Sequence, residues 1–202
     1  MPYSDFTIRQ AQRDFSLEIV EKAGIFSQIE AAHVSGAFSK TLEENIPLAV
    51  AINTEKARSE LIIANVLLEL RRLFDRKISF FSGVEFNVDK ERGLNGFCDF
   101  LISRSPEQLF VKAPVIAVVE AKNENIMSGI GQCIAEMVAA QQFNAQDGEG
   151  MSAVYGAVTS GTAWKFMKLA GSSVHLDLKD YNLDDTPGRI IGILAAMIEL
   201  KA

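Results

Sequence analysis

A run of five apolar residues, from Val115 to Val119, constrains the fold of this chain more than any other segment. An unbroken apolar run of this length, rich in β-branched residues, is typical of a strand that is buried on both faces of a sheet. We therefore expect it to be a central strand. The run ends in three charged residues, Glu120, Lys122 and Glu124, and a buried strand does not end in this way without a physical reason.

The rest of the chain alternates between helical and strand patterns. Apolar residues recur at helical spacing in the segments 53–74, 129–146 and 187–202. Strand patterns bounded by turn residues occupy the segments 78–88, 96–104, 115–121, 152–160, 162–170 and 173–180. Strands interrupted by helices of this length predict an α/β fold, with a central mixed β-sheet flanked by helices.

The first 52 residues show the weakest patterns. We expect residues 1–52 to form an N-terminal helical extension that packs on a core of residues 53–202, within one structural unit. Short helices are expected at 17–26 and 29–38, and Pro47 is expected to help end the helical structure that precedes it.

The charge balance restricts the partners of this chain. It contains 26 acidic residues against 20 lysines and arginines, for a net charge of -6 at pH 7. This balance excludes a strongly basic surface that coats nucleic acid. It leaves open contact with nucleic acid through one local groove or through bound cations.

The sequence shows no targeting or membrane-spanning segment. The N-terminal stretch MPYSDFTIRQ is polar, and no apolar run approaches the roughly 18 residues of a membrane span. Cys98 and Cys133 belong to no Cys/His cluster, so we expect two buried free thiols in a reducing compartment. These features predict a cytoplasmic protein without membrane contact.

The charged end of the apolar strand predicts a metal site. Residues two apart on a strand point to the same face, so Glu120 and Lys122 share a side. Asp99 is the only acid in the apolar segment FCDFLI, where an unpaired charge is strongly unfavourable. A hard cation such as Mg²⁺, or Mn²⁺ in its place, prefers oxygen ligands and would be shared by Asp99 and Glu120. A lysine beside it could orient or help deprotonate the attacking water, and could stabilise charge on a phosphate.

An acid-x-Lys triplet is weak evidence by itself, because it occurs four times in the chain. The triplets at 75–77 and 199–201 stand at the end of a predicted helix and at the chain terminus. The triplet at 177–179 follows an alternating pattern that predicts a half-exposed edge strand. Only the triplet at 120–122 ends a wholly apolar run with another acid in an apolar segment upstream.

The order of these features resembles that of the PD-(D/E)XK nuclease superfamily, which has the restriction-endonuclease-like fold. The shared features are an acid on the first helix (Glu60 in ARSELIIANVL), an acid on a strand (Asp99 in GFCDF), the strand end VVEAKNE, and a helix that opens with Gln132. The segment YGAVTSGTAWKFMKL also resembles the paired strands, turn and tryptophan of several of its nuclease domains. The resemblance covers roughly residues 53–200. The proline that precedes the aspartate in the family is replaced here by Cys98.

The resemblance implies a set of roles at the strand ends. Asp99 and Glu120 would be the metal carboxylates, with the backbone carbonyl of Ala121 as a further ligand, and Lys122 would be the catalytic lysine. The implied activity is metal-dependent hydrolysis of DNA phosphodiester bonds by an activated water. The plainer alternatives are that Asp99 is a structural acid satisfied by backbone amides, and that Glu120 and Lys122 form a surface ion pair.

Two helix residues also have implied roles. Glu60 would be an outer acid near the metal, and Gln132 would position a metal-bound water or the substrate. Both are alternatively solvated helix residues, because charged and amide side chains usually face water. Trp164 could stack on a base, although a core position on a hairpin fits its residue type better.

DNA is the expected partner, and a homodimer would allow a small nuclease to cut both strands of a duplex. Two other functions stay open from the sequence. The same fold could serve as a non-cleaving nucleic-acid-binding or scaffold domain, which the acidic charge balance favours. It could also hydrolyse a small phosphorylated substrate.

Overall fold

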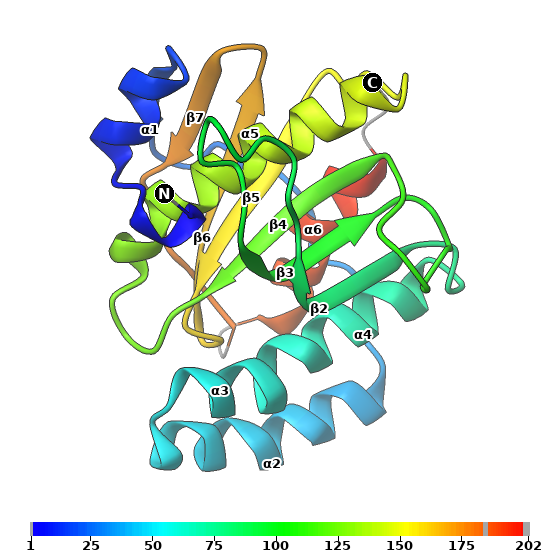
Figure 1. Cartoon of the computed structure of the whole chain (residues 1–202). Helices are drawn as coiled ribbons and strands as arrows, with labels where there is room; N and C mark the ends of the chain where they lie inside the picture. Colours follow the sequence, from blue (N-terminus) through cyan, green and yellow to red (C-terminus); the bar gives the residue numbers. More distant parts are fainter. Residues whose placement is uncertain (1, 184–185, 200–202) are drawn as a thin grey trace.

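The computed structural model of the chain describes residues 2–183 and 186–199 (Figure 1). The helical elements are η1 (Tyr3–Asp5), α1 (Ile8–Asp14), α2 (Gly36–Ile52), α3 (Glu55–Arg58), the π-helical turn η2 (Ser59–Ile63), α4 (Ala64–Leu73), η3 (Ile126–Gly129), α5 (Ile130–Gln146) and α6 (Pro187–Glu199). The strands are β1 (Glu18–Lys22), β2 (Ser79–Glu85), β3 (Phe97–Ser103), β4 (Val115–Ala121), β5 (Val154–Thr159), β6 (Ala163–Ala170), β7 (Ser173–Asp177) and β8 (Tyr181–Asn182). Within the described ranges, no helix has the length and apolarity that crossing a membrane requires.

The strands of the described part of the chain form one mixed sheet of eight strands. Its order is β1-β7-β6-β5-β4-β3-β2, and β8 pairs with β6. β4 has an inner position, antiparallel to β3 and parallel to β5. β1 and β7 are also parallel, and the other pairs are antiparallel. The predicted α/β class and the central position of the strand at 115–121 are confirmed.

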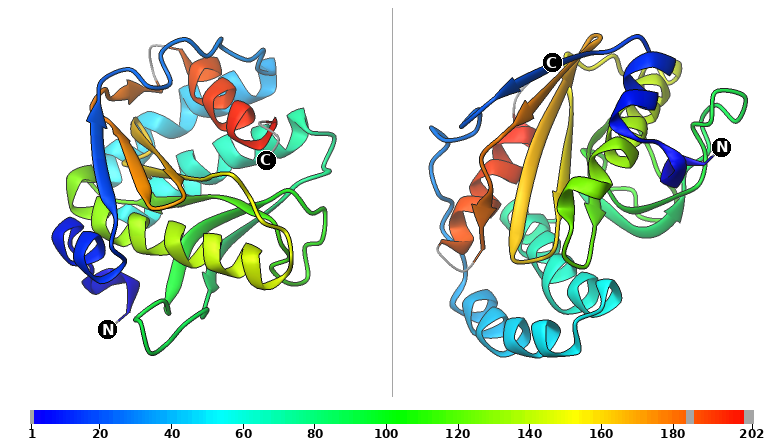
Figure 2. Two further views of the ribbon diagram at one scale, coloured as in Figure 1. Left: turned by 90° about the horizontal axis from the view of Figure 1, so that it is seen from above. Right: turned by 90° about the vertical axis from the view of Figure 1, so that its left-hand side faces the viewer.

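Helices cover both faces of this sheet (Figure 2). α1 and α5 pack on one face, and α2, α4 and α6 pack on the other. Each face has its own hydrophobic core, and β4 contributes to both: Val118 lies in the core beneath α5, and Val119 in the core beneath α6. All residues of β4 are buried. The apolar run lacks polar positions because neither of its faces meets water.

The helix predicted at 53–74 forms, as the continuous helical stretch α3, η2 and α4. Its π-helical turn leaves the Leu61 carbonyl available for side-chain partners. The amide groups of Asn45 on α2 and Asn65 on α4 both donate to this oxygen, each at 2.9 Å. The Leu61 carbonyl is therefore satisfied by side-chain donors, and the bond from Asn45 links α2 to the next helical stretch.

The prediction of a helix at 17–26 is wrong. Residues 18–22 form β1, which pairs in parallel with β7 from Glu18 opposite Ser173 to Lys22 opposite Asp177. Hydrogen bonding to a strand 155 residues away outweighs the helical spacing of this short segment. The N-terminal part of the chain thus completes the sheet, in addition to supplying helices.

The helix predicted at 29–38 and the stop predicted at Pro47 are also wrong. α2 begins only at Gly36, after Ser35, whose hydroxyl accepts a hydrogen bond from the Phe38 N–H at 3.1 Å. Pro47 lies inside α2. The helix continues past the missing N–H because Leu42 before it and Ala49 after it are both buried in the core.

The helix predicted at 187–202 forms as α6 from Pro187 to Glu199. Residues 200–202 lie outside the described residues, and these include two of the three residues of the triplet at 199–201.

The prediction that the triplet at 177–179 lies on a half-exposed edge strand is wrong as well. β7 lies between β1 and β6, and Asp177 is completely buried. Its carboxylate accepts hydrogen bonds from the backbone N–H groups of Gly24 (2.6 Å), Phe26 (3.2 Å) and Lys179 (2.9 Å), and from the Tyr181 hydroxyl (2.9 Å). Asp177 is therefore a structural acid that holds the segment after β1.

Trp164 and the two cysteines are buried in the core, as the sequence predicts for these residue types. Trp164 is fully buried, and its indole N–H donates to the Gly161 carbonyl at 2.8 Å. Cys98 and Cys133 are free and buried. Burial raises the pKa of both thiols, which keeps them protonated and unreactive.

We predict that Asp177→Ala lowers the free energy of unfolding by about 3 kcal/mol or more, because buried donors left unpaired cost about 1–3 kcal/mol each. Urea denaturation of Asp177→Ala, with the exposed-site variant Glu149→Ala as control, measures this loss. A loss no larger than that of the control would contradict the structural role.

The same carboxylate predicts a pH dependence. Burial by itself raises the pKa of Asp177. The hydrogen bonds from the backbone and from Tyr181 have a larger, opposite effect, so the net pKa lies below that of a free aspartate. The stability it contributes is complete above the unfolded pKa of about 3.9 and is lost as the pH falls through the lower folded pKa. The difference between wild type and Asp177→Ala should therefore shrink in acid.

Candidate active site

Asp99 and Glu120 come together because β3 and β4 are adjacent and antiparallel. Phe100 pairs with Val119, so Asp99 and Glu120 lie one step further along at the same end of the two strands. The Asp99 carboxylate is half-buried and accepts a hydrogen bond from the backbone N–H of Ala121 at 2.8 Å through Oδ2. The two acids predicted to share a site therefore lie at the same end of the sheet.

The strands β3 and β4 separate at this point. The Ala121 N–H donates to the Asp99 side chain, and the next N–H, of Lys122, donates to the Thr159 carbonyl after β5 at 2.8 Å. β4 thus follows β5 and leaves β3, with the Asp99 carboxylate between the two chains. The prediction that Asp99 is satisfied by backbone amides is met in part, since one oxygen has such a bond.

Glu120 and Lys122 form an ion pair inside the protein. The Lys122 ammonium donates to Oε1 of Glu120. The Glu120 side chain is 1% exposed and that of Lys122 is 20% exposed, so the interpretation as a surface ion pair is wrong. The other carboxylate oxygen, Glu120 Oε2, is buried and has no hydrogen-bond partner among the described residues.

The burial of this pair shifts both of its pKa values. Burial, and then the negative charge of Asp99, raise the pKa of Glu120, against the opposing effect of Lys122. Burial lowers the pKa of Lys122, but Glu120, together with the negative charges of Glu55 and Asp99, more than offsets this, and the net pKa lies above the ordinary value. Both pKa values are therefore raised: the neighbouring acids stabilise the charged form of Lys122, and burial disfavours the charged form of Glu120.

α5 brings Gln132 to this site together with a residue that the sequence reasoning missed, Glu136. Gln132 is half-buried, and its Nε2 donates to Glu136 Oε1 at 3.0 Å. Glu136 is completely buried, and burial and then the charge of Glu120 raise its pKa well above the ordinary value. An acid inside the apolar helical segment CIAEMVAA was a detectable feature, of the same kind as Asp99 in FCDFLI.

The start of α5 packs directly against the ion pair, and only glycine fits there. A Cβ atom on Gly129 would lie 2.8 Å from Val158 Cγ1, 3.0 Å from Lys122 Cε and 3.2 Å from Glu120 Cγ. These distances are shorter than normal carbon contacts. Gly129 therefore allows the helix to approach the charged pair closely.

The first core helix contributes Arg58 to the surroundings of the site, and it carries Glu60 on its exposed surface. Arg58 is buried and donates to the Asn123 side chain (3.1 Å) and to the Ser160 carbonyl (3.1 Å), which follow β4 and β5. The Glu60 side chain is 65% exposed and lies 3.8 Å from the Lys56 ammonium. The acid of this helix that raises the pKa of Lys122 is Glu55, on α3.

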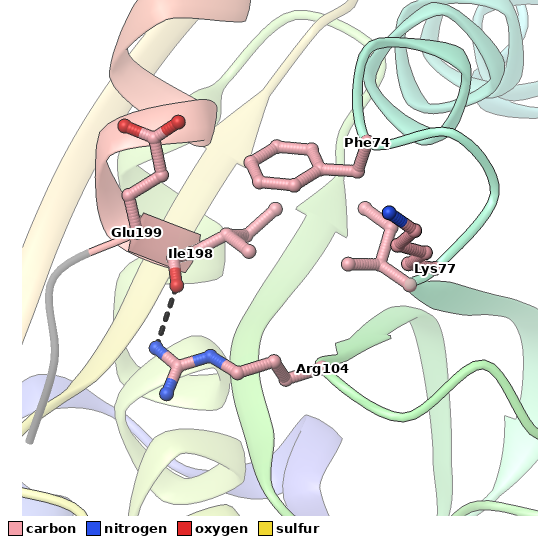
Figure 3. Close-up of a pocket in the computed structure, with 6 residues that line it drawn as sticks. Phe74, Lys77, Arg104, Ile198 and Glu199 are labelled. Atoms are coloured by element: carbon pink, nitrogen blue, oxygen red, sulfur yellow. Dashed lines mark hydrogen bonds between the residues drawn. The ribbon is translucent and has the colours of Figure 1, made fainter.

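A surface hollow elsewhere on the molecule is not part of this site. It has a volume of about 310 Å³ and is lined by Phe74, Lys77, Ile78, Arg104, Ile198 and Glu199 (Figure 3). Arg104 follows the far end of β3 from Asp99, and its guanidinium donates to the Ile198 carbonyl at 2.6 Å. The hollow therefore lies at the opposite end of the strand that carries Asp99.

The residues at the site fit a hard cation with few protein ligands. Within the described ranges, no group of three or more His, Cys, Asp or Glu side chains is arranged so that it could hold a metal ion. Mg²⁺, however, often takes only one or two carboxylates and completes its coordination with water and substrate oxygens. Asp99 and Glu120 supply two carboxylates, and Glu120 Oε2 is a buried acceptor with no hydrogen-bond donor among the described residues.

We predict that Gly129→Ala lowers the free energy of unfolding by about 1–3 kcal/mol, the usual cost of overpacking. Gly36→Ala is the matched control, because a Cβ at Gly36 would meet nothing within 4 Å among the described residues. Thermal and urea unfolding of the two variants measure the difference. Equal stability of both variants would show that the contact between α5 and the Glu120–Lys122 pair is loose.

The chain was compared with models of protein families and with curated proteins, and neither comparison found a match.

Proposed function

We propose that this chain is a metal-dependent nuclease that hydrolyses DNA phosphodiester bonds, on a restriction-endonuclease-like variant of the α/β fold. One observation carries the proposal. Asp99 and Glu120 converge at the ends of adjacent strands beside Lys122, and a buried oxygen of Glu120 has no hydrogen-bond partner in the part of the chain that the structure describes. Two carboxylates and a lysine are the groups that hydrolysis of a phosphodiester by a metal-bound water requires.

The three side chains have separate roles in this proposal. Asp99 and Glu120 would hold the cation, with the Ala121 carbonyl as a further ligand. A bound Mg²⁺ or Mn²⁺ would neutralise phosphate charge and lower the pKa of its water. Lys122 holds its proton, because its pKa lies above the ordinary value. It therefore acts as a charged donor to a phosphate oxygen, and we do not assign it the role of a base.

The edge of the sheet beside Asp99 gives a substrate room to approach. Ser82 and Val84 of β2 pair with Phe100 and Cys98, so Gly83 lies across from Asp99. A Cβ atom on Gly83 would have no neighbour within 4 Å among the described residues. This uncrowded edge fits the proposal that a nucleic-acid strand contacts the site locally, the mode of contact that a net charge of -6 leaves open.

A non-cleaving nucleic-acid-binding domain is the second candidate, and one contact favours it. The Lys122 ammonium is bonded to Glu120, and the Glu120 side chain is almost completely buried. In a nuclease this contact has to loosen when metal and substrate bind. In a binding domain it would persist as a structural ion pair.

We predict that the protein cleaves DNA in the presence of Mg²⁺ or Mn²⁺, and that Lys122→Ala lowers the rate about 100- to 1,000-fold, the usual effect of removing one transition-state donor. Cleavage of supercoiled plasmid and of single-stranded oligonucleotides measures the rate. Lys179→Ala is the matched control, because Lys179 belongs to an acid-x-Lys triplet whose acid is structural. Wild-type protein that is folded and does not cut would leave the binding domain as the better candidate.

We predict that Mg²⁺ or Mn²⁺ raises the melting temperature of wild type and not of Asp99→Asn, because a cation that binds only the folded state stabilises it. At a metal concentration of 100 times Kd the stabilisation is about 2.7 kcal/mol. Thermal unfolding with and without metal is the measurement. Glu149→Gln is the control and should respond as wild type does, since Glu149 is exposed in the segment after α5. The same metal response in Asp99→Asn would place the cation elsewhere.

A further inference from the structure

Glu136 is a buried acid to which the proposed reaction assigns no role. It lies on α5 within an apolar segment, and its side chain is completely buried. One carboxylate oxygen, Oε2, has no hydrogen-bond partner among the described residues. An apolar side chain of similar size would suit this position better, because an acid without full compensation destabilises a core.

The single hydrogen bond described for the Glu136 side chain joins it to Gln132, a residue with a proposed role at the site. Its Oε1 accepts from Nε2 of Gln132, one turn earlier on α5, at 3.0 Å. Gln132 and Glu136 lie one turn apart on one face of α5, and Gly129, the N-cap residue of this helix, precedes Gln132 by three residues on the same side. Gly129 on this face packs against Glu120 and Lys122. The Gln132–Glu136 pair therefore lies next to the ion pair, with Glu136 in the core and Gln132 partly open to solvent.

The chemistry of the two groups determines how the amide is oriented. Glu136 Oε1 accepts from Gln132 Nε2, so the NH₂ group of Gln132 faces Glu136. The raised pKa favours the protonated acid, whose carbonyl oxygen accepts in the same way while its proton lies on Oε2. The amide is planar, and its oxygen consequently points away from Glu136. Without an acceptor at position 136, the amide would be free to turn, and either its oxygen or its nitrogen could face the site.

We propose that Glu136 is a positioning residue that holds the Gln132 amide so that its oxygen accepts a hydrogen bond from the water that attacks the phosphodiester. This inference rests on the proposed nuclease function. The water then has an acceptor for one of its hydrogens, and its lone pair is directed by that bond. Glu136 does not touch the water and acts only through Gln132.

The test separates the acceptor at position 136 from its charge and its bulk. Glu136→Leu removes the acceptor and keeps the volume, whereas Glu136→Gln keeps a carbonyl oxygen that can accept from Gln132. We expect Glu136→Leu to lower kcat about 10- to 100-fold, as loss of an outer partner of a site does, with KM unchanged. Glu136→Gln should retain most of kcat. Gln142→Ala, half-buried on the same helix, is the control and should cut as wild type does.

Two combinations decide between positioning and other roles. In the Gln132→Ala background, Glu136→Leu should cause no further loss of kcat, because the amide that it positions is already absent. Equal losses in Glu136→Gln and Glu136→Leu would overturn the proposal, since they would show that the charge of Glu136 acts on the site directly. Additive losses in the double variant would overturn it as well.

Stability and spectroscopy test the inference without cleavage. Glu136→Leu should melt at a temperature equal to or higher than that of wild type, because it replaces a buried acid by an apolar group. In NMR spectra the side-chain NH₂ of Gln132 should be ordered in wild type and in Glu136→Gln, and averaged in Glu136→Leu. An ordered Gln132 amide in Glu136→Leu would overturn the proposal. If wild type does not cut DNA, the nuclease function fails, and the NMR result still decides whether Glu136 positions Gln132.

Discussion

The burial of β4 on both faces is the constraint from which the site follows. Because Val115 to Val119 pack into two cores at once, β4 has an inner position, and Glu120 at its end lies beneath α5. The acid is 1% exposed, so it needs a charged partner inside the protein, and Lys122, the residue directly after β4, supplies one. Gly129 keeps the helix close enough to enclose both. The charges at the end of the strand are thus part of the packing around it.

The site gathers three acids and one lysine, and two of the acids, Glu120 and Glu136, are buried. Asp99, Glu120 and Glu136 act on one another electrostatically, and Lys122 is the cation among them. Two of their oxygens, on Glu120 and Glu136, lack hydrogen-bond partners among the described residues. Such an arrangement destabilises the fold, and positions of this kind are commonly retained for function. By contrast, Asp177 is equally buried and satisfied by four donors, as a structural acid should be.

Other segments hold this arrangement from outside. The guanidinium of Arg58 joins the first core helix to the residues after β4 and β5, and the Asn53 side chain donates to Glu124 at 3.2 Å. On the other side, a Cβ atom on Gly131 would lie 2.3 Å from the Phe6 carbonyl, so the N-terminal segment packs against the start of α5. The N-terminal 52 residues therefore support both the sheet and the helix that carries Gln132 and Glu136.

The sequence by itself determined the strand at 115–121, the alternation of helices and strands from residue 53 onwards, and the juxtaposition of Asp99, Glu120 and Lys122. The spacing of apolar residues is a local property, and β3 and β4 are consecutive in the chain, so both features can be deduced from residues that are close in sequence. Only the tertiary structure decided that 18–22 is a strand, that Asp177 is enclosed, and that Arg58 and Glu136 border the site. Asp177 is bound by residues about 150 positions away, from Gly24 to Phe26. Whether a polar residue is buried and satisfied depends on such distant partners, and a local pattern contains no information about them.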